Sequence, residues 1–282
     1  MESAAEALPG NIPVEVRPYA VDPLFVRSSL TLTHPDGTPV ECGLLEPREP
    51  GTRRPAILVM AGRDMGRRAV DHVTDLKNVV VVALDYGYEP RGRYTFKSFI
   101  QDLPGMRQAA LNVIPSARLA LEYLRQRPDV DATRIVLLGY SFGAPLVPRI
   151  AAEDQGLALA GMIYGGGNLR TLIAHNMRRS RGWIMSHLAG LVASLFLKPL
   201  DPLHHAPEVA PTRFLMVNGS LDELIPRKNA EALFRRALSP KKIVWLDSKH
   251  ITPRNHELTR RITGVIRDEM VAMQLLNATH MA

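Results

Sequence analysis

Short apolar runs alternate along the chain with segments of helical periodicity. Eight runs have the length and composition of strands: 24–33, 40–45, 56–60, 78–84, 135–138, 158–164, 214–217 and 243–246. The first two flank a Pro-Asp-Gly-Thr turn, so they predict an antiparallel hairpin. The other six are continuously apolar, which is typical of strands covered on both faces.

Apolar residues recur at helical spacing in 117–124 and in 258–266. A hairpin followed by strand–helix repeats predicts an α/β fold, with a mostly parallel eight-stranded sheet and helices on both faces. Residues 168–206 contain no strand pattern, and their apolar part is too short for the roughly 20 residues that span a bilayer. We therefore expect a helical cap insertion at 168–206 in a core domain of 1–167 and 207–282.

Composition and charge indicate a soluble protein in a reducing compartment. The net charge is +7, but the arginines are dispersed and no nucleic-acid motif accompanies them, so we expect no nucleic-acid partner. Cys42 is the only cysteine, which excludes an internal disulfide. The opening MESAAEALPGNIP lacks the apolar core of a secretory signal. The expected location is the cytoplasm, and the sequence leaves the oligomeric state open.

A serine between two glycines follows the run 135–138, in RIVLLGYSFGAPL. Ligands bind at the carboxyl ends of strands in open parallel sheets, and Ser141 lies at such an end. Gly139 and Gly143 remove the side chains that a sharp strand-to-helix turn would crowd. Pro148 is expected to kink or shorten the following helix. The pattern predicts that Ser141 is a nucleophile.

A serine hydroxyl needs a base, and the base needs an acid that fixes its tautomer. Asp222 follows the run 214–217 in NGSLDELIP, and His250 follows the run 243–246 in DSKHITP. All three residues therefore come after strands of the same predicted sheet. Their order along the chain, Ser–Asp–His, is that of nucleophile-elbow hydrolases.

Through GYSFG, NGSLDELIP and DSKH the chain resembles the α/β-hydrolases, and among them the dienelactone-hydrolase-like and carboxylesterase branches. The resemblance extends from about residue 25 to 270. It implies the α/β-hydrolase fold and a catalytic triad of Ser141, Asp222 and His250. Asp222 is preferred over the adjacent Glu223 because it occupies the family's G-x-x-D position. Dienelactone hydrolases have a cysteine nucleophile, so the serine argues against dienelactone as substrate.

The resemblance also implies an oxyanion hole in the stretch MAGRDMG, where Ala61 replaces the family's histidine. We assign its two backbone N–H donors to Arg63 and Phe142, with Gly62 as the alternative to Arg63. Whether the Arg63 side chain contacts substrate stays open.

The predicted function is hydrolysis of carboxylic esters with short- to medium-chain acyl groups, without metal or cofactor. A thioesterase or a peptidase-type acyl hydrolase would use the same triad, and a non-catalytic binding protein on this fold is a further alternative. In the cap, Leu191 and Leu195 are expected to bind the acyl chain. Two other roles remain open for the apolar cap helix. It packs wholly against the body, or it contacts an anionic membrane surface beside the basic stretch RRSR, 178–181.

Overall fold

A computed structural model of the protein describes residues 4–7, 12–49, 53–62, 65–73, 76–87, 96–181 and 183–277. One sheet runs through the molecule in the order β1-β2-β3-β4-β6-β5-β7-β8-β9-β10. The pairs from β1 to β4, and β4 with β6, are antiparallel, and all pairs from β6 to β10 are parallel. The predicted mostly parallel α/β architecture is confirmed.

The sheet has ten strands in the described residues, so the predicted number of eight is wrong. The strands are β1 Ala4–Ala7, β2 Pro13–Val21, β3 Phe25–Thr33, β4 Pro39–Pro47, β5 Arg54–Met60, β6 Val80–Leu84, β7 Val130–Tyr140, β8 Leu159–Ile163, β9 Arg213–Gly219 and β10 Lys241–Leu246. Sequence analysis missed β1 and β2. The first lacks β-branched and aromatic residues, and the second contains Pro18, where the register with β3 shifts.

Helices cover both faces of the sheet. They are α1 Phe96–Gln126, α2 Val147–Glu153, α3 Leu169–Arg181, α4 Trp183–Phe196, α5 Pro202–His205, α6 Arg227–Arg236 and α7 His256–Ala272, with 3-10 turns η1 Gly66–His72, η2 Ala144–Leu146, η3 Lys198–Leu200 and η4 Ala206–Val209. The predicted helical patterns 117–124 and 258–266 lie in α1 and α7. Helix α2 is seven residues long and has Pro148 in its first turn, where a proline is tolerated, so the predicted kink or shortening by Pro148 is not seen.

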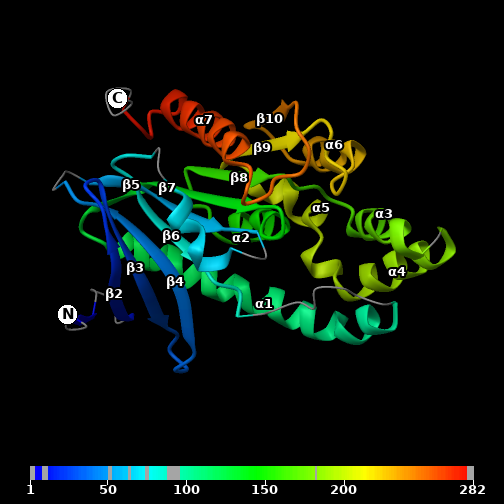
Figure 1. Ribbon diagram of the computed structural model, residues 1–282, viewed down its shortest axis with the longest axis horizontal. Coiled ribbons are helices and arrows are strands. Elements are labelled where there is room, and N and C mark those ends of the chain that lie inside the picture. The colour runs from blue at the N-terminus through cyan, green and yellow to red at the C-terminus, as the bar shows by residue number, and fades with distance from the viewer. Residues whose placement is uncertain are drawn as a thin grey trace.

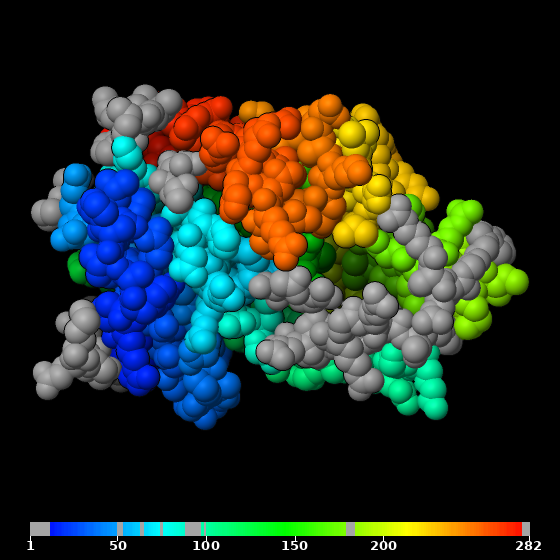
Figure 2. Space-filling view, in the orientation of Figure 1, coloured from blue at the N-terminus to red at the C-terminus, as the bar shows by residue number. Residues whose placement is uncertain are grey.

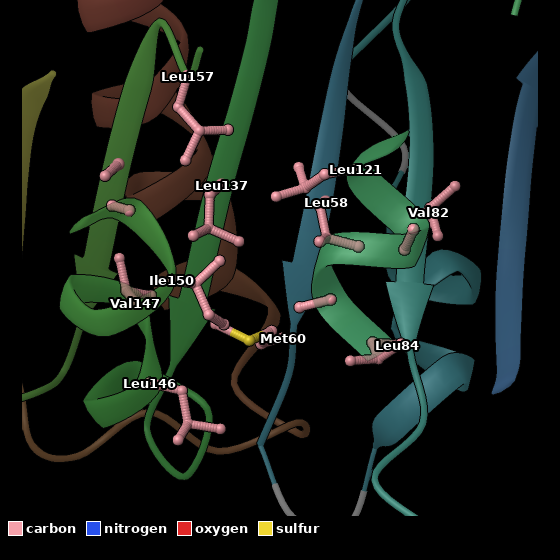
Figure 3. Packing of buried hydrophobic residues seen from close by; sticks show 14 of the residues in the cluster. Leu58, Met60, Val82, Leu84, Leu121, Leu137, Leu146, Val147, Ile150 and Leu157 are labelled. Carbon is pink, nitrogen blue, oxygen red and sulfur yellow. The ribbon is translucent and has the colours of Figure 1, made fainter. Parts of the chain in front are cut away.

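Alternate residues of each central strand enter different cores. Leu58 and Met60 of β5 pack under α1 and α2, together with Leu121 and Ile150 of those helices (Figure 3). Ile57 and Val59 point to the opposite face, where η1 and α7 cover them. This alternation follows from the two-residue period of a strand.

The described residues of 168–206, all except 182, form helices and turns without a strand among them. Helices α3 and α4 form an antiparallel pair beyond the end of the sheet, and the first part of α1 lies next to α4 (Figure 1). Separation into a cap at 168–206 and a core of 1–167 and 207–282 remains a prediction. None of the helices described in the structure is long and apolar enough to cross a membrane.

A buried carboxylate attaches α7 to the last two strands. Glu269 is 2% exposed and accepts hydrogen bonds from Arg213 Nε of β9 at 2.8 Å and from Lys242 Nζ of β10 at 2.6 Å. Burial acts to raise the pKa of Glu269, but the hydrogen bonds from Lys242 and Arg213 outweigh it and lower the pKa below its usual value. The charged form therefore stabilises the fold.

We expect Glu269→Gln to lower the free energy of unfolding by about 1–2 kcal/mol at pH 7. A carboxylate with a depressed folded pKa contributes stability above its unfolded pKa of about 4.3, and this contribution is lost as pH falls through the folded pKa. The gap between variant and wild type should therefore shrink as pH falls below about 4, as urea unfolding at neutral and acidic pH will measure. Asp268→Asn, at an exposed neighbour, is the control. An equal gap at both pH values would contradict this account.

Candidate active site

Ser141 occupies a strained turn at the carboxyl end of the central strand β7. Its φ is +49°, in the left-handed region that residues with side chains seldom adopt. Its N–H donates to the Ile163 carbonyl at 2.9 Å, and the short turn η2 follows directly. Such strain is characteristic of positions where a structure holds one side chain in a fixed direction. The turn presents the Ser141 hydroxyl above the end of the sheet.

The two flanking glycines are required by close approaches of the chain. A Cβ atom at Gly143 would collide with the Met60 carbonyl and with the Tyr86 hydroxyl. A Cβ atom at Gly139 would lie 2.7 Å from the Gly143 carbonyl oxygen and would also collide with the Val147 side chain. The prediction that Gly139 and Gly143 avoid steric collisions at the turn is thus confirmed.

Hydrogen bonds link Ser141, His250 and Asp222 in a chain. Ser141 Oγ lies 2.7 Å from His250 Nε2, and His250 Nδ1 lies 2.7 Å from Asp222 Oδ2. The Asp222 side chain is fully buried and that of His250 is 13% exposed. The other carboxylate oxygen of Asp222 accepts from the N–H groups of Leu224 and Ile225 at 2.8 and 3.0 Å. Those two bonds fix the carboxylate so that its free oxygen faces the imidazole.

Glu223, the alternative acid, is exposed on the same loop and does not pair with His250. The loop is also attached to α3. Its carbonyl at Glu223 lies 2.9 Å from His175 Nε2, and its carbonyl at Leu224 accepts from Asn176 Nδ2 at 2.9 Å. The structure thus brings the three residues of the predicted triad together and leaves Glu223 outside.

Sequence reasoning missed Tyr164 and Ser248, which support the imidazole. The buried Tyr164 ring meets His250 edge-on, with centroids 5.6 Å apart, and its hydroxyl hydrogen-bonds with Ser248 Oγ. Burial raises the pKa of Tyr164, so its hydroxyl stays neutral. Gly219 leaves room for this contact, because a Cβ there would lie 2.9 Å from the Tyr164 ring. The available signal was the position of Tyr164 directly after β8, between the two strands that lead to Ser141 and Asp222.

Phe142 and Gly62 line the same cavity as Ser141, so their backbone N–H groups are candidate donors. Among the backbone hydrogen bonds of the described residues, none uses the N–H of Phe142 or of Gly62. Tyr86 lies between the two loops, with its hydroxyl donating to the Ala61 carbonyl and its ring meeting Phe142 edge-on at 5.3 Å. Arg63, to which the second donor of the oxyanion hole was assigned, lies outside the described residues. That assignment remains a prediction, as does the one for Phe142.

A cavity of about 780 Å³ opens at Ser141 and extends between the sheet and its covering elements η1 and α7. Figure 2 shows residues 65–73 and 76–87 in cyan against the orange stretch that includes the start of α7. The rings of His72 and His256, which both line the cavity, stack with their centroids 6.5 Å apart. The deep wall is apolar, formed by Ile57, Val59, Leu76, Val81, Leu138 and Ile266.

Helix α3 contributes Leu172 and Asn176 to the lining of this cavity. Leu191 and Leu195 of α4, expected to bind substrate, do not belong to the described lining and are 40% and 70% exposed. The prediction therefore does not match the described site. The physical reason is that α4 packs through its small residues, which turns its large ones outward. Within the described chain, no cluster of three or more His, Cys, Asp or Glu side chains suits a metal ion.

Comparisons with known proteins agree with this geometry. The profile of the family Serine hydrolase (FSH1) matches residues 106–262, more than half of the chain and including Ser141, Asp222 and His250. The uncharacterized protein YfhR of Salmonella typhimurium (strain LT2) is 27% identical over 161 residues, which cover 56% of this chain and 53% of that protein. The chain thus spans about half the length of the curated relatives it matches.

Solved structures share the fold at low sequence identity. An acetyl xylan esterase from Paenibacillus sp. R4 is similar with a TM-score of 0.63 and 19% identity, covering 89% of this chain and 88% of that one. The alpha/beta hydrolase GrgF from Penicillium sp. sh18 has a TM-score of 0.56 and 18% identity, covering 90% and 99%. These likenesses confirm the α/β-hydrolase fold.

The turn at Ser141 should tolerate no added carbon at Gly143. We expect Gly143→Ala to lower the free energy of unfolding by about 1–3 kcal/mol, because the Met60 carbonyl and the Tyr86 hydroxyl must move. Gly62→Ala is the matched control, since nothing lies within 4 Å of a Cβ there, and its effect should stay within about 0.5 kcal/mol. Chemical denaturation of both variants measures the difference. Equal losses would show that the crowding at Gly143 does not limit the turn.

Proposed function

The chain belongs to the FSH1 family of serine hydrolases, and we propose that it hydrolyses carboxylic esters through an acyl-enzyme intermediate. The observation that carries the proposal is the unbroken chain of hydrogen bonds from the buried Asp222 through His250 to Ser141. A likeness to an acetyl xylan esterase agrees with ester chemistry.

In this mechanism Ser141 Oγ attacks the acyl carbonyl while its proton passes to His250 Nε2. Asp222 accepts the hydrogen bond from His250 Nδ1, which fixes the tautomer and stabilises the imidazolium that forms. The imidazolium then gives its proton to the leaving alcohol as the ester bond breaks. A water molecule, deprotonated by His250, attacks the acyl-enzyme, and the acid is released as Ser141 recovers its proton.

The tetrahedral intermediate carries a negative oxygen that needs hydrogen-bond donors. The backbone N–H of Phe142, together with that of Arg63 or Gly62, is the proposed pair. Backbone donors held by the surrounding fold need no reorganisation during the reaction. Tyr86, which contacts both loops, would keep the two donors at a constant separation.

The cavity supports an acyl group longer than acetyl. Ile57, Val59 and Ala61 line it from one face of β5, and Ala61 lies at the end where β7 leads to Ser141. From Ile57 to Ala61 the strand advances by four residues, roughly 13 Å at about 3.3 Å per residue. An extended acyl chain of about eleven carbons has this length, since its ten carbon–carbon bonds each advance it by roughly 1.3 Å. We therefore propose medium-chain esters as substrates.

Removal of the nucleophile tests the mechanism. We expect Ser141→Ala to lower kcat/KM for nitrophenyl esters by a factor on the order of 10³ or more, without loss of the fold. Asp222→Asn should also be severe, because the imidazole loses its fixed tautomer. Glu223→Gln is the matched control and should change turnover less than about threefold. Substantial turnover by the Ser141→Ala protein, or a larger defect in the Glu223→Gln protein, would refute the assignment.

A larger side chain in the deep part of the cavity tests the acyl site. We expect Val59→Phe to lower the ratio of kcat/KM for octanoate over butyrate esters by about tenfold or more, since the added ring occupies space that the longer chain needs. Leu58→Phe, at the adjacent residue, faces the opposite core, and it should lower the melting temperature without changing this ratio.

The two experiments fail separately. If Ser141→Ala abolishes turnover while Val59→Phe leaves the chain-length ratio unchanged, ester hydrolysis stands and the acyl chain binds elsewhere.

A further inference from the structure

Helix α4 carries an outward row of large apolar side chains. Ile184, Leu188, Leu191 and Leu195 follow the spacing i, i+4, i+7, i+11, which places them on one face of a helix. Their exposed fractions are 73%, 44%, 40% and 70%. We refer to these four residues as the α4 stripe. Contiguous apolar surface of this kind on a soluble protein marks an interaction site.

The orientation of α4 is fixed by its other face. Ser186, Ala189, Gly190 and Ala193 are buried, and they lie opposite the α4 stripe around the helix. Gly190 lets the helices approach closely, because a Cβ there would collide with the Arg170 carbonyl and lie 3.0 Å from the Ala174 side chain. The helix therefore packs through small residues and keeps its large apolar ones in solvent.

The helical pair is strongly basic. Residues 169–200 contain no Asp or Glu and five basic residues: Arg170, Arg178, Arg179, Arg181 and Lys198. The side chains of Arg170, Arg178 and Lys198 are exposed. Apolar and cationic groups thus occur together on one unit that lies beyond the end of the sheet (Figure 1).

The positive charge bears on whether a second copy of the chain or a lipid surface covers the α4 stripe. In a symmetric dimer the same helical pair meets itself, which brings like charges such as those of Arg170, Arg178 and Lys198 toward one another without any Asp or Glu of residues 169–200 to balance them. An anionic lipid surface attracts the same cations and accepts the apolar side chains at its interface. The observations therefore favour lipid over a second copy of the chain.

A groove next to the α4 stripe combines apolar and basic residues, as an anionic lipid requires. It measures about 500 Å³ and is lined by Leu195, Phe196 and Pro199 together with Pro104, Arg107 and Gln108 of α1. Arg107 lines this groove together with the apolar Leu195 and Phe196, a combination that suits a lipid phosphate next to its acyl chains.

We propose that α3 and α4 dock on an anionic phospholipid surface, with the α4 stripe entering the interface and the basic residues contacting the headgroups. The proposal does not depend on the catalytic assignment. A Ser141→Ala protein should bind membranes as the wild type does.

Co-sedimentation with vesicles tests the proposal on the full chain. We expect binding to vesicles of mixed phosphatidylcholine and phosphatidylglycerol, and at least tenfold weaker binding to phosphatidylcholine alone or at high salt. Ile184→Ser combined with Leu195→Ser should reduce binding about tenfold or more, and so should Arg170→Glu combined with Arg178→Glu. Melting temperatures of these exposed-site variants verify that they fold.

Matched controls lie at the other end of the molecule. Val21→Ser removes an exposed apolar side chain of β2, and Arg267→Glu reverses an exposed charge of α7. Both should bind vesicles as the wild type does. Equal binding to neutral vesicles, or binding that the stripe and charge variants leave unchanged, would overturn the proposal. So would a dimer in light scattering that Leu191→Ser dissociates, because a second copy would then cover the α4 stripe.

Discussion

The parallel register of β7 through β10 brings the proposed catalytic groups together. Tyr140 pairs with Ile163, Ile163 with Val217, and Val217 with Val244, so the carboxyl ends of four strands are level. Ser141 follows the first of these residues directly, and Asp222 and His250 follow the third and fourth by a few residues. Loops this short can span only small distances. A shift of one strand by a single register step would separate the hydrogen-bonded groups, so the geometry of the site depends on the pairing of the sheet.

Much of this arrangement can be predicted from the sequence, because buried parallel strands and tight turns leave strong local patterns. The apolar runs predict eight strands, and the glycines around Ser141 reflect real collisions. The order of Asp222 and His250 after successive strands was sufficient to place them in one site. Strand β2, between β1 and β3, was missed, because Pro18 and a mixed polar pattern give it no clear periodicity.

Helix α4 shows where the apolar pattern of a sequence fails to predict which residues are buried. Apolar content predicts burial, yet it does not say which face of a helix is buried. In α4 the close approach of α3 at Gly190 determines which face is buried, and the larger residues Leu191 and Leu195 therefore point to solvent. Tyr164 was missed for a related reason. A tyrosine after a strand has many roles, and its contact with His250 depends on tertiary structure that no local pattern encodes.

The loop after β9 connects helix α3 to the carboxylate of Asp222. Its amide groups at Leu224 and Ile225 hold the Asp222 carboxylate, and its carbonyl at Leu224 is held by Asn176 of α3. The loop therefore links α3, a helix at the periphery, to the carboxylate of Asp222, which accepts the hydrogen bond from His250. A displacement of α3 must either break its bonds to the loop or tilt the carboxylate. Mechanical force applied to the outermost helices is thus transmitted to the orientation of a single imidazole ring.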